Sequence, residues 1–195
     1  QRGELARLRK MADQNADVQV TRHRKRRSGS LEQAAANDGA KMLELDSLDH
    51  IVCFDMAQLQ GDERVGASVV LRKGRPAKKE YRTYRVRSDA PDDLRMMTEV
   101  VERWLKHQDG WPDLLLLDGG QTHLSTIERM LDGHGLAGRF PVAALAKREE
   151  TLHMDGREPL ILSKHGRVLV HARDESHRFV NRYHRRRRGK GAMDD

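Results

Sequence analysis

The stretch that decides the fold is residues 112–120, PDLLLLDGG, in which four leucines stand between turn-forming residues. A short, unbroken apolar run bounded by proline and glycine is typical of a strand buried on both faces, as in a parallel sheet. Asp118 ends the run, and the glycines after it permit a ligand to approach the backbone closely. The sequence therefore predicts a buried parallel strand with a carboxylate at its carboxyl end.

The segments on either side of this strand predict a mixed sheet. Upstream, residues 50–56, 66–72 and 80–86 have strand character, and Gly74-Arg75-Pro76 marks a turn between the last two. Short links between three strands favour an antiparallel meander. Further elements are expected as helices at residues 91–104, 121–131 and 165–183, a buried strand at 140–146, and a hairpin at 151–162 around Asp155-Gly156.

This order of elements predicts an α/β fold of the ribonuclease H-like class. Its mixed sheet combines a three-stranded antiparallel meander with parallel strands, and helices flank it. We expect three regions: a helical segment with a basic linker (1–47), the compact domain (48–188) and a tail (189–195). Within the first region, helices are predicted at residues 4–16 and 31–45, with the basic linker at 21–30.

Composition excludes several classes of protein. The chain has 195 residues, 37% hydrophobic and 34% charged, which is enough for one domain with a real core. No apolar stretch is long enough to span a bilayer, and no secretory signal is visible, so we expect a cytoplasmic protein with no membrane partner. The single cysteine, Cys53, excludes an internal disulfide framework and a cysteine zinc cluster.

The positive charge of the chain is concentrated at its two ends. Residues 1–30 hold nine Lys and Arg against three acids, and residues 173–190 hold eight against two, within a total of +7. Basic blocks of this kind fit binding to a polyanion such as nucleic acid. The simpler alternative is a solvated helix face and tail. Aromatic residues make up only 4% of the chain, which disfavours a site that stacks single-stranded bases.

Two aspartates end predicted strands, Asp55 the first and Asp118 the fourth. Ligands of open α/β sheets collect beyond the carboxyl ends of strands, so these carboxylates converge if the two strands are neighbours. Convergent carboxylates hold Mg²⁺ or Mn²⁺, which activate water for phosphodiester hydrolysis. The alternative for each is a solvated turn residue. His177, on the last helix with Asp174 and Glu175, is a candidate third ligand, although a lone helical histidine is more often structural.

An ordered set of motifs is similar to the endonuclease domain of the UvrC family over about residues 48–188. The motifs are residues 51–55 (IVCFD), Gln60-Gly61, 67–70, Glu80-Tyr81-Arg82, 91–97, 112–120, Ala146-Lys147, 173–179 (RDESHRF) and Tyr183-His184-Arg185. The resemblance implies a ribonuclease H-like nuclease that makes the 5′ incision of nucleotide excision repair. Its partners would be damaged double-stranded DNA and UvrB loaded on that DNA, as part of the UvrABC system.

The resemblance also assigns roles to residues. It implies that Asp55, Asp118 and His177 are catalytic and hold Mg²⁺ or Mn²⁺, and that Asp93 is a further acidic catalytic position. We expect phosphate contacts from six basic residues: Lys147, Arg178, Arg185, Arg186, Arg187 and Arg188.

The sequence departs from the family pattern beside these positions. Ala57 and Gln58 stand where the family has Ser-His, and Gln121 stands where it has lysine. These departures leave open a catalytically weak DNA-binding or scaffold protein. A second alternative is a ribonuclease H-like nuclease for another substrate, such as an RNA–DNA hybrid. The sequence shows neither the family's paired Gly-Ile-Tyr module nor its tandem helix-hairpin-helix module, so we expect duplex affinity to rest on the basic ends.

Overall fold

The structure is a computed structural model, and it describes residues 11, 19–20, 29–58, 64–86, 92–147 and 150–191, without the side chains of 58 and 184–191. The predicted helix at residues 4–16 and most of the basic linker lie outside this part. Gly29 and Ser30, predicted as the end of the linker, already belong to a helix that runs from residue 29 to 42. No helix in the described ranges is both long enough and apolar enough to cross a membrane.

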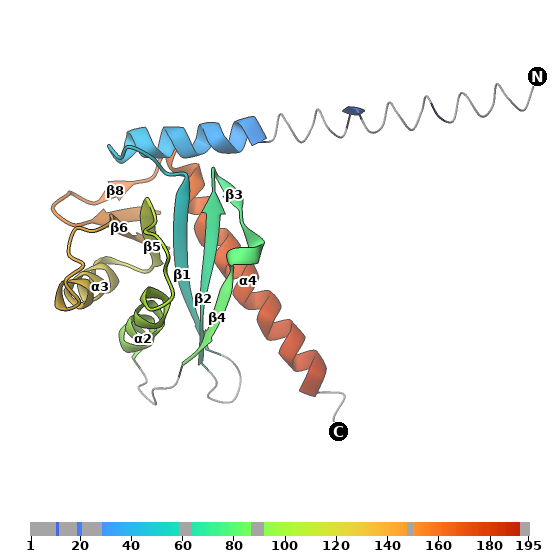
Figure 1. Ribbon diagram of the computed structural model, residues 1–195, viewed down its shortest axis with the longest axis vertical. Helices are drawn as coiled ribbons and strands as arrows, with labels where there is room; N and C mark the ends of the chain where they lie inside the picture. Colours follow the sequence, from blue (N-terminus) through green and yellow to red (C-terminus); the bar gives the residue numbers. More distant parts are fainter. Residues whose placement is uncertain are drawn as a thin grey trace, which may run out of the picture.

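One mixed sheet of eight strands forms the centre of the molecule (Figure 1). Seven strands follow the order β3-β2-β1-β5-β6-β7-β8, and β4 also pairs with β2. β1 and β5 are parallel, as are β5 and β6, whereas β1 and β2 are antiparallel. The strands are β1 (His50–Gln58), β2 (Arg64–Arg72), β3 (Arg75–Pro76), β4 (Arg82–Arg85), β5 (Leu114–Asp118), β6 (Val142–Ala146), β7 (Thr151–Met154) and β8 (Leu160–Ile161).

The predicted α/β fold and its main strands are confirmed, with two differences. Arg75 and Pro76, predicted as part of a turn, form β3 and pair with β2. The third predicted strand, residues 80–86, begins only at Arg82, because a short 3-10 helix, η1 (Lys78–Glu80), precedes it. The Glu80 N–H donates to the Ala77 carbonyl at 2.8 Å, and the Glu80 carboxylate pairs with Arg72 at 2.8 Å. This turn places Tyr81 in the core, where its ring packs edge-on against Phe179 with 5.0 Å between the ring centroids.

Helices cover both faces of the sheet and create two hydrophobic cores. The helix at 29–42 and α4 (Arg167–Gly191) pack on one face, against Ile51, Cys53, Leu114 and Leu116. α2 (Asp93–Leu105) and α3 (Gln121–Gly133) pack on the other. Successive strand residues point to opposite faces, so the four leucines of β5 serve both cores and are all fully buried. That arrangement explains why this strand has no polar alternation.

α2 shows how the local sequence fixes an element that borders the site. The Asp92 side chain caps the helix by accepting the Leu94 N–H at 3.0 Å. Apolar residues recur every three to four positions after it and face the core; they are Met96, Met97, Val100, Val101 and Trp104. Asp93, the first residue of the helix, is therefore held at the sheet edge.

The helix at 29–42 contributes to the same core as the sheet. Ala36 and Ala40 from this helix and Leu43 just after it are buried among β1, β2 and α4. The expected boundary between residues 47 and 48 stays a prediction, and these contacts join both sides of it.

Candidate metal centre

Pairing of β1 with β5 brings the two predicted aspartates together. The strands are parallel neighbours with Phe54 opposite Leu117, so Asp55 and Asp118 are the next residues on each strand. Alternation places both side chains on the same face as Cys53 and Leu116, which is the face that α4 covers. Asp55 is 4% exposed and the Asp118 side chain 5% exposed. The predicted convergence is therefore observed.

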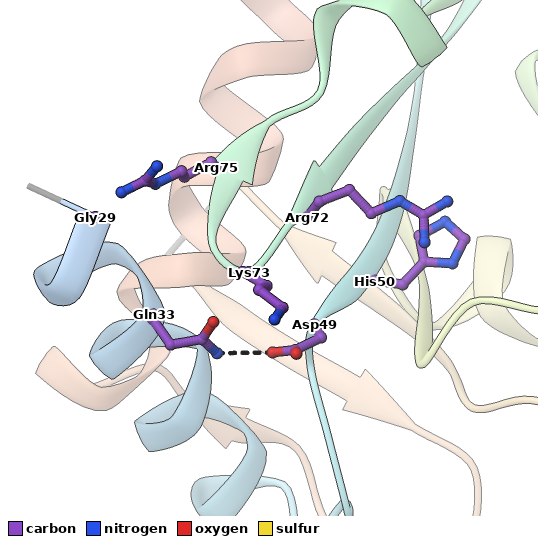
Figure 2. A pocket seen from close by; sticks show the side chains of 7 residues that line it. All are labelled: Gly29, Gln33, Asp49, His50, Arg72, Lys73 and Arg75. Carbon is purple, nitrogen blue, oxygen red and sulfur yellow. Dashed lines mark hydrogen bonds between the residues drawn. The ribbon is translucent and has the colours of Figure 1, made fainter. Parts of the chain in front are cut away.

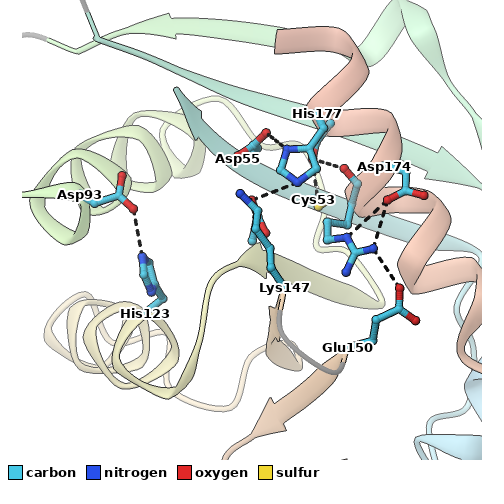
Figure 3. Close-up of polar contacts among 11 residues, drawn as sticks. Cys53, Asp55, Asp93, His123, Lys147, Glu150, Asp174 and His177 are labelled. Atoms are coloured by element: carbon cyan, nitrogen blue, oxygen red, sulfur yellow. Dashed lines mark hydrogen bonds and ion pairs between the residues drawn. The ribbon is translucent and has the colours of Figure 1, made fainter. Parts of the chain in front are cut away.

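α4 supplies the third predicted residue. The helix is fixed on the sheet by a buried stripe of Leu169, Ala172 and Ser176, and the next residue, His177, faces the aspartates. Its Nδ1 lies 2.7 Å from Asp55 Oδ2, and its Nε2 lies 3.4 Å from Asp118 Oδ2 (Figure 3). One imidazole thus bridges two carboxylates from different strands.

The cluster disfavours two ionised carboxylates in the absence of a cation. Burial raises the pKa of Asp118, and the neighbouring Asp55 charge adds to this effect, while His177 and Lys147 oppose it. The hydrogen bond with Asp55 raises the pKa of His177. Asp118 Oδ1 is buried and has no hydrogen-bond partner among the described residues. A buried carboxylate oxygen without a donor is the kind of group that a bound cation satisfies.

The donor set fits a divalent cation. One ligand atom from each of Asp55, Asp118 and His177 lies within 4.8 Å of the others. Two carboxylate oxygens suit Mg²⁺, and an added imidazole nitrogen also suits Mn²⁺. The unpartnered Asp118 oxygen supports the same conclusion, so the residues present fit a metal of this class.

Lys147 borders the cluster on its solvent side. It directly follows β6, the neighbour of β5, and its Nζ lies 3.4 Å from Asp118 Oδ2 with the side chain 68% exposed. An exposed ammonium beside the carboxylates is well placed to attract a phosphate.

The other predicted site residues lie outside the three-residue cluster. Asp93 is 57% exposed, and its Oδ2 lies 3.2 Å from His123 Nε2. Asp174 pairs with Arg173 at 3.2 Å, and Glu175 binds Arg178 at 2.8 Å. Neither Asp174 nor Glu175, the acidic residues before His177 on the helix, therefore contributes to the Asp55–Asp118–His177 cluster.

The predicted phosphate-binding residues of α4 are only partly described. Arg178 is 58% exposed, but its guanidinium is already paired with Glu175, which leaves less of its charge for DNA. Residues 185–188 continue the helix, and their side chains lie outside the described part.

Two groups near the cluster were not found by reasoning from the sequence. His123 contacts Asp93, and Tyr81 donates from its hydroxyl to the buried Glu175 carboxylate at 3.1 Å. Both contacts join residues far apart in the chain. For the His123–Asp93 contact, the sequence did offer one signal. His123 follows Gly120 by three residues and lies in the first turn of a helix that begins just after a strand.

A polar cavity of about 490 Å³ lies at the His50 end of β1, away from the Asp55–Asp118–His177 cluster (Figure 2). Arg72, Lys73 and Arg75 line it together with Gln33, which donates to Asp49 at 2.7 Å. Arg72 and Arg75 already pair with Glu80 and Glu32. His50 and Asp55 are separated by about 17 Å of extended strand, so this cavity is distinct from the metal-type cluster.

Comparison with known proteins agrees with this architecture. A sequence profile of the UvrC RNase H endonuclease domain matches residues 40–180. The UvrABC system protein C of Salinibacter ruber is 38% identical over 208 residues, covering 99% of this chain and 33% of that protein. The protein of the same name from Desulfatibacillum aliphaticivorans is 35% identical over 205 residues, covering 97% and 34%.

A search of solved structures finds endonuclease V from Ciona intestinalis in complex with inosine-containing DNA. Its TM-score is 0.39 with 15% sequence identity, over 60% of this chain and 55% of that one. The chain spans about a third of the length of the two curated relatives. On the profile match and these relatives, the chain belongs to the UvrC family and carries that family's RNase H endonuclease domain.

Proposed function

We propose that this domain is a divalent-metal-dependent DNA endonuclease, with Asp55, Asp118 and His177 as its metal ligands. The single observation that carries the proposal is the Asp118 carboxylate. It is buried beside a second carboxylate, and one of its oxygens has no hydrogen-bond partner in the described structure. A phosphodiesterase centre of the carboxylate type needs such an arrangement before the ion binds.

Each residue has a distinct task in this proposal. Asp55 accepts the Nδ1 proton of His177 and so fixes the imidazole with Nε2 directed toward Asp118. The two carboxylates and Nε2 then form one face of a ligand set. When bound there, a divalent ion supplies an activated water and neutralises charge on the phosphate. Lys147, exposed at the rim, attracts the phosphate and positions it without reading sequence.

We further propose that the domain makes the 5′ incision of nucleotide excision repair on damaged duplex DNA, together with UvrB. Two considerations support this assignment: the curated relatives are named UvrABC system protein C, and the motifs that carry the family resemblance include the cluster itself. The +7 charge of the chain suits a polyanionic substrate.

The test is cleavage of a duplex that carries a lesion and a nick on its 3′ side, with UvrB loaded, in Mn²⁺, Mg²⁺ or EDTA. Wild type is compared with Asp118→Asn and with Asp155→Asn, a matched control in the exposed turn between β7 and β8. We expect a metal-dependent cut on the 5′ side of the lesion by wild type and control, and at least a 100-fold loss in Asp118→Asn. Equal cutting by all three proteins would refute the assigned site.

A second candidate is a DNA-binding scaffold without nuclease activity. Lys147 and His177 already pair with the carboxylates, and these contacts stabilise the cluster without an ion. Ala57 and Gln121 also lack the functional groups that the family carries at these positions. The scaffold predicts retained DNA binding with no cutting in either metal. An RNA–DNA hybrid in the same assay tests the remaining alternative, and faster cutting of the hybrid than of the duplex would favour it.

A further inference from the structure

A second polar pair lies across the sheet edge from His177. Asp93 begins α2, and His123 lies in the first turn of α3, so both come from the helices on the opposite face of the sheet. His123 Nε2 is 3.2 Å from Asp93 Oδ2. Figure 3 shows this pair facing Lys147, with the Asp55–His177 pair beyond it. The end of the sheet that carries Asp55 and Asp118 thus has one histidine on each face, His177 on one and His123 on the other.

The His123 ring lies directly against the backbone beside Asp118. A Cβ atom added to Gly119 would stand 2.4 Å from His123 Cγ and 2.6 Å from Nδ1. The glycine that follows Asp118 therefore makes room for this ring. The His123 side chain is only 20% exposed, so it is packed beside Gly119 and Asp93 rather than free at the surface.

The two ring nitrogens have different surroundings. The hydrogen bond to His123 lowers the pKa of Asp93, so Asp93 is ionised and Nε2 must be the donor. Nδ1 is the nitrogen beside Gly119. The charged groups around the ring are Asp93 from α2, which contacts Nε2, and Lys147 after β6; Asp118 immediately precedes Gly119, against which the ring lies.

Fold stability gives little reason for this arrangement. An ion pair with one partner more than half exposed contributes at most about 1 kcal/mol. The His123 ring nonetheless lies against Gly119, the residue after Asp118, and it fits there because glycine has no side chain.

We propose that His123 is a further catalytic residue of this site, donating the proton from Nδ1 to the sugar oxygen that leaves, and that Asp93 is its positioning residue. The inference rests on the proposed function. In the step, a water oxygen forms a bond to phosphorus, and the bond from phosphorus to the sugar oxygen breaks. The leaving oxygen takes the His123 proton, the attacking water loses one proton to solvent, and the neutral imidazole recovers a proton from solvent.

The experiment compares wild type with His123→Gln, which keeps a side-chain amide for Asp93 but carries no acidic proton. His134→Gln, at the other end of α3, is the matched control, since the His134 side chain contacts only the Met130 carbonyl among the interactions described for it. The ends of the wild-type products first identify which bridging oxygen leaves. A second substrate then carries sulfur at that position, because a thiolate leaves without needing a proton. Thermal unfolding verifies that each variant is folded.

We expect His123→Gln to cut the oxygen substrate about 100-fold more slowly than wild type and the sulfur substrate at nearly the wild-type rate. His134→Gln should match wild type on both. An equal loss on both substrates, or no loss on either, would reject the role of His123 and leave the nuclease proposal standing. A wild type that cuts neither substrate would reject the proposed function, and this inference with it.

Discussion

Gly119 and Gly133 provide a matched pair of glycines that bracket α3. At Gly119 an added methyl group collides with the His123 ring at 2.4 Å, whereas at Gly133, inside the last turn of α3, nothing lies within 4 Å. We expect Gly119→Ala to lower the free energy of unfolding by about 1–3 kcal/mol, the usual cost of overpacking. Gly133→Ala should raise it by up to about 1 kcal/mol, because alanine favours the helix. Denaturant unfolding measures both, and a similar change in the two variants would contradict the packing of His123.

Asp118 should reduce the stability of the metal-free protein. Its carboxylate is buried beside Asp55, and burial raises its pKa, so its ionisation costs the folded state stability as the pH rises above the ordinary aspartate pKa. Asp118→Asn removes the charge and offers Asp55 an amide N–H donor, which the ionised carboxylate lacks. In EDTA at pH 8 we expect the free energy of unfolding to rise by roughly 1 kcal/mol.

The matched control for this measurement is Asp155→Asn, which should stay within about 0.5 kcal/mol of wild type. A loss of stability in Asp118→Asn would mean that Lys147 and His177 fully compensate the buried charge.

At the residue scale, the sequence predicted Asp55 and Asp118 because each closes an apolar run, and parallel strands present their carboxyl ends at one edge. Asp118 does end β5, whereas β1 continues to Gln58, so the prediction that Asp55 ends its strand was wrong; the pairing of β1 with β5 still brings the two residues together. His177 was a weak candidate from spacing alone, since a helical histidine does not reveal what it faces. The Asp93–His123 contact could not be predicted, because it depends on how two helices pack on the sheet.

At the element scale, α4 is held by a buried carboxylate two residues before His177. Glu175 is 8% exposed and accepts hydrogen bonds from Tyr81 and Arg178. We expect Glu175→Ala to destabilise the protein by about 2–3 kcal/mol, since it leaves the buried Tyr81 hydroxyl without its acceptor and removes the partner of Arg178. The neighbouring Asp174→Ala should cost about 0.5 kcal/mol, because Arg173 keeps its bond to Glu150.

Thermal and denaturant unfolding of these two variants distinguish a structural anchor from a surface charge. Equal effects at the two positions would show that Glu175 does not anchor the helix.

Elements with a single strong pattern were the predictable ones. The helix predicted at residues 91–104 was confirmed as α2, because the 3.6-residue period of its apolar residues agrees with the aspartate cap at its start. The segment at 75–85 was less predictable. The sequence predicted a turn at residues 74–76 and one strand at 80–86, whereas the structure has β3, η1 and β4 here. The Arg72–Glu80 pair and the burial of Tyr81 favour a helical turn where that strand was expected to begin.

At the scale of the whole molecule, the helix at 29–42 belongs to the folded body. It places Ala36 and Ala40 in the core beneath α4, with Leu43 following. A chain that starts at residue 29 should therefore unfold cooperatively, and one that starts at residue 48 should lose several kcal/mol of stability. Calorimetry of the two truncated proteins tests this. Equal stability would support the boundary predicted between residues 47 and 48.

The same architecture explains where the site lies. Strand parity places Asp55, Asp118 and Lys147 on one side of the sheet edge, and α4 completes the cluster from above it. The sequence predicted most of the strands and their order along the chain, but it left open whether the strands of Asp55 and Asp118 are neighbours, and it did not determine which helix covers which face. That assignment depends on long-range packing, and it decides that His177 meets the carboxylates while Asp174 does not.

The most direct test of the account is Mn²⁺ binding to the full chain by isothermal titration calorimetry, with Asp118→Asn and Asp155→Asn in parallel. We expect wild type and Asp155→Asn to bind one Mn²⁺ per chain at the Asp55–Asp118–His177 cluster, and Asp118→Asn to lose that binding. Unchanged binding in Asp118→Asn, or none in wild type, would contradict the claim that this cluster is a metal centre.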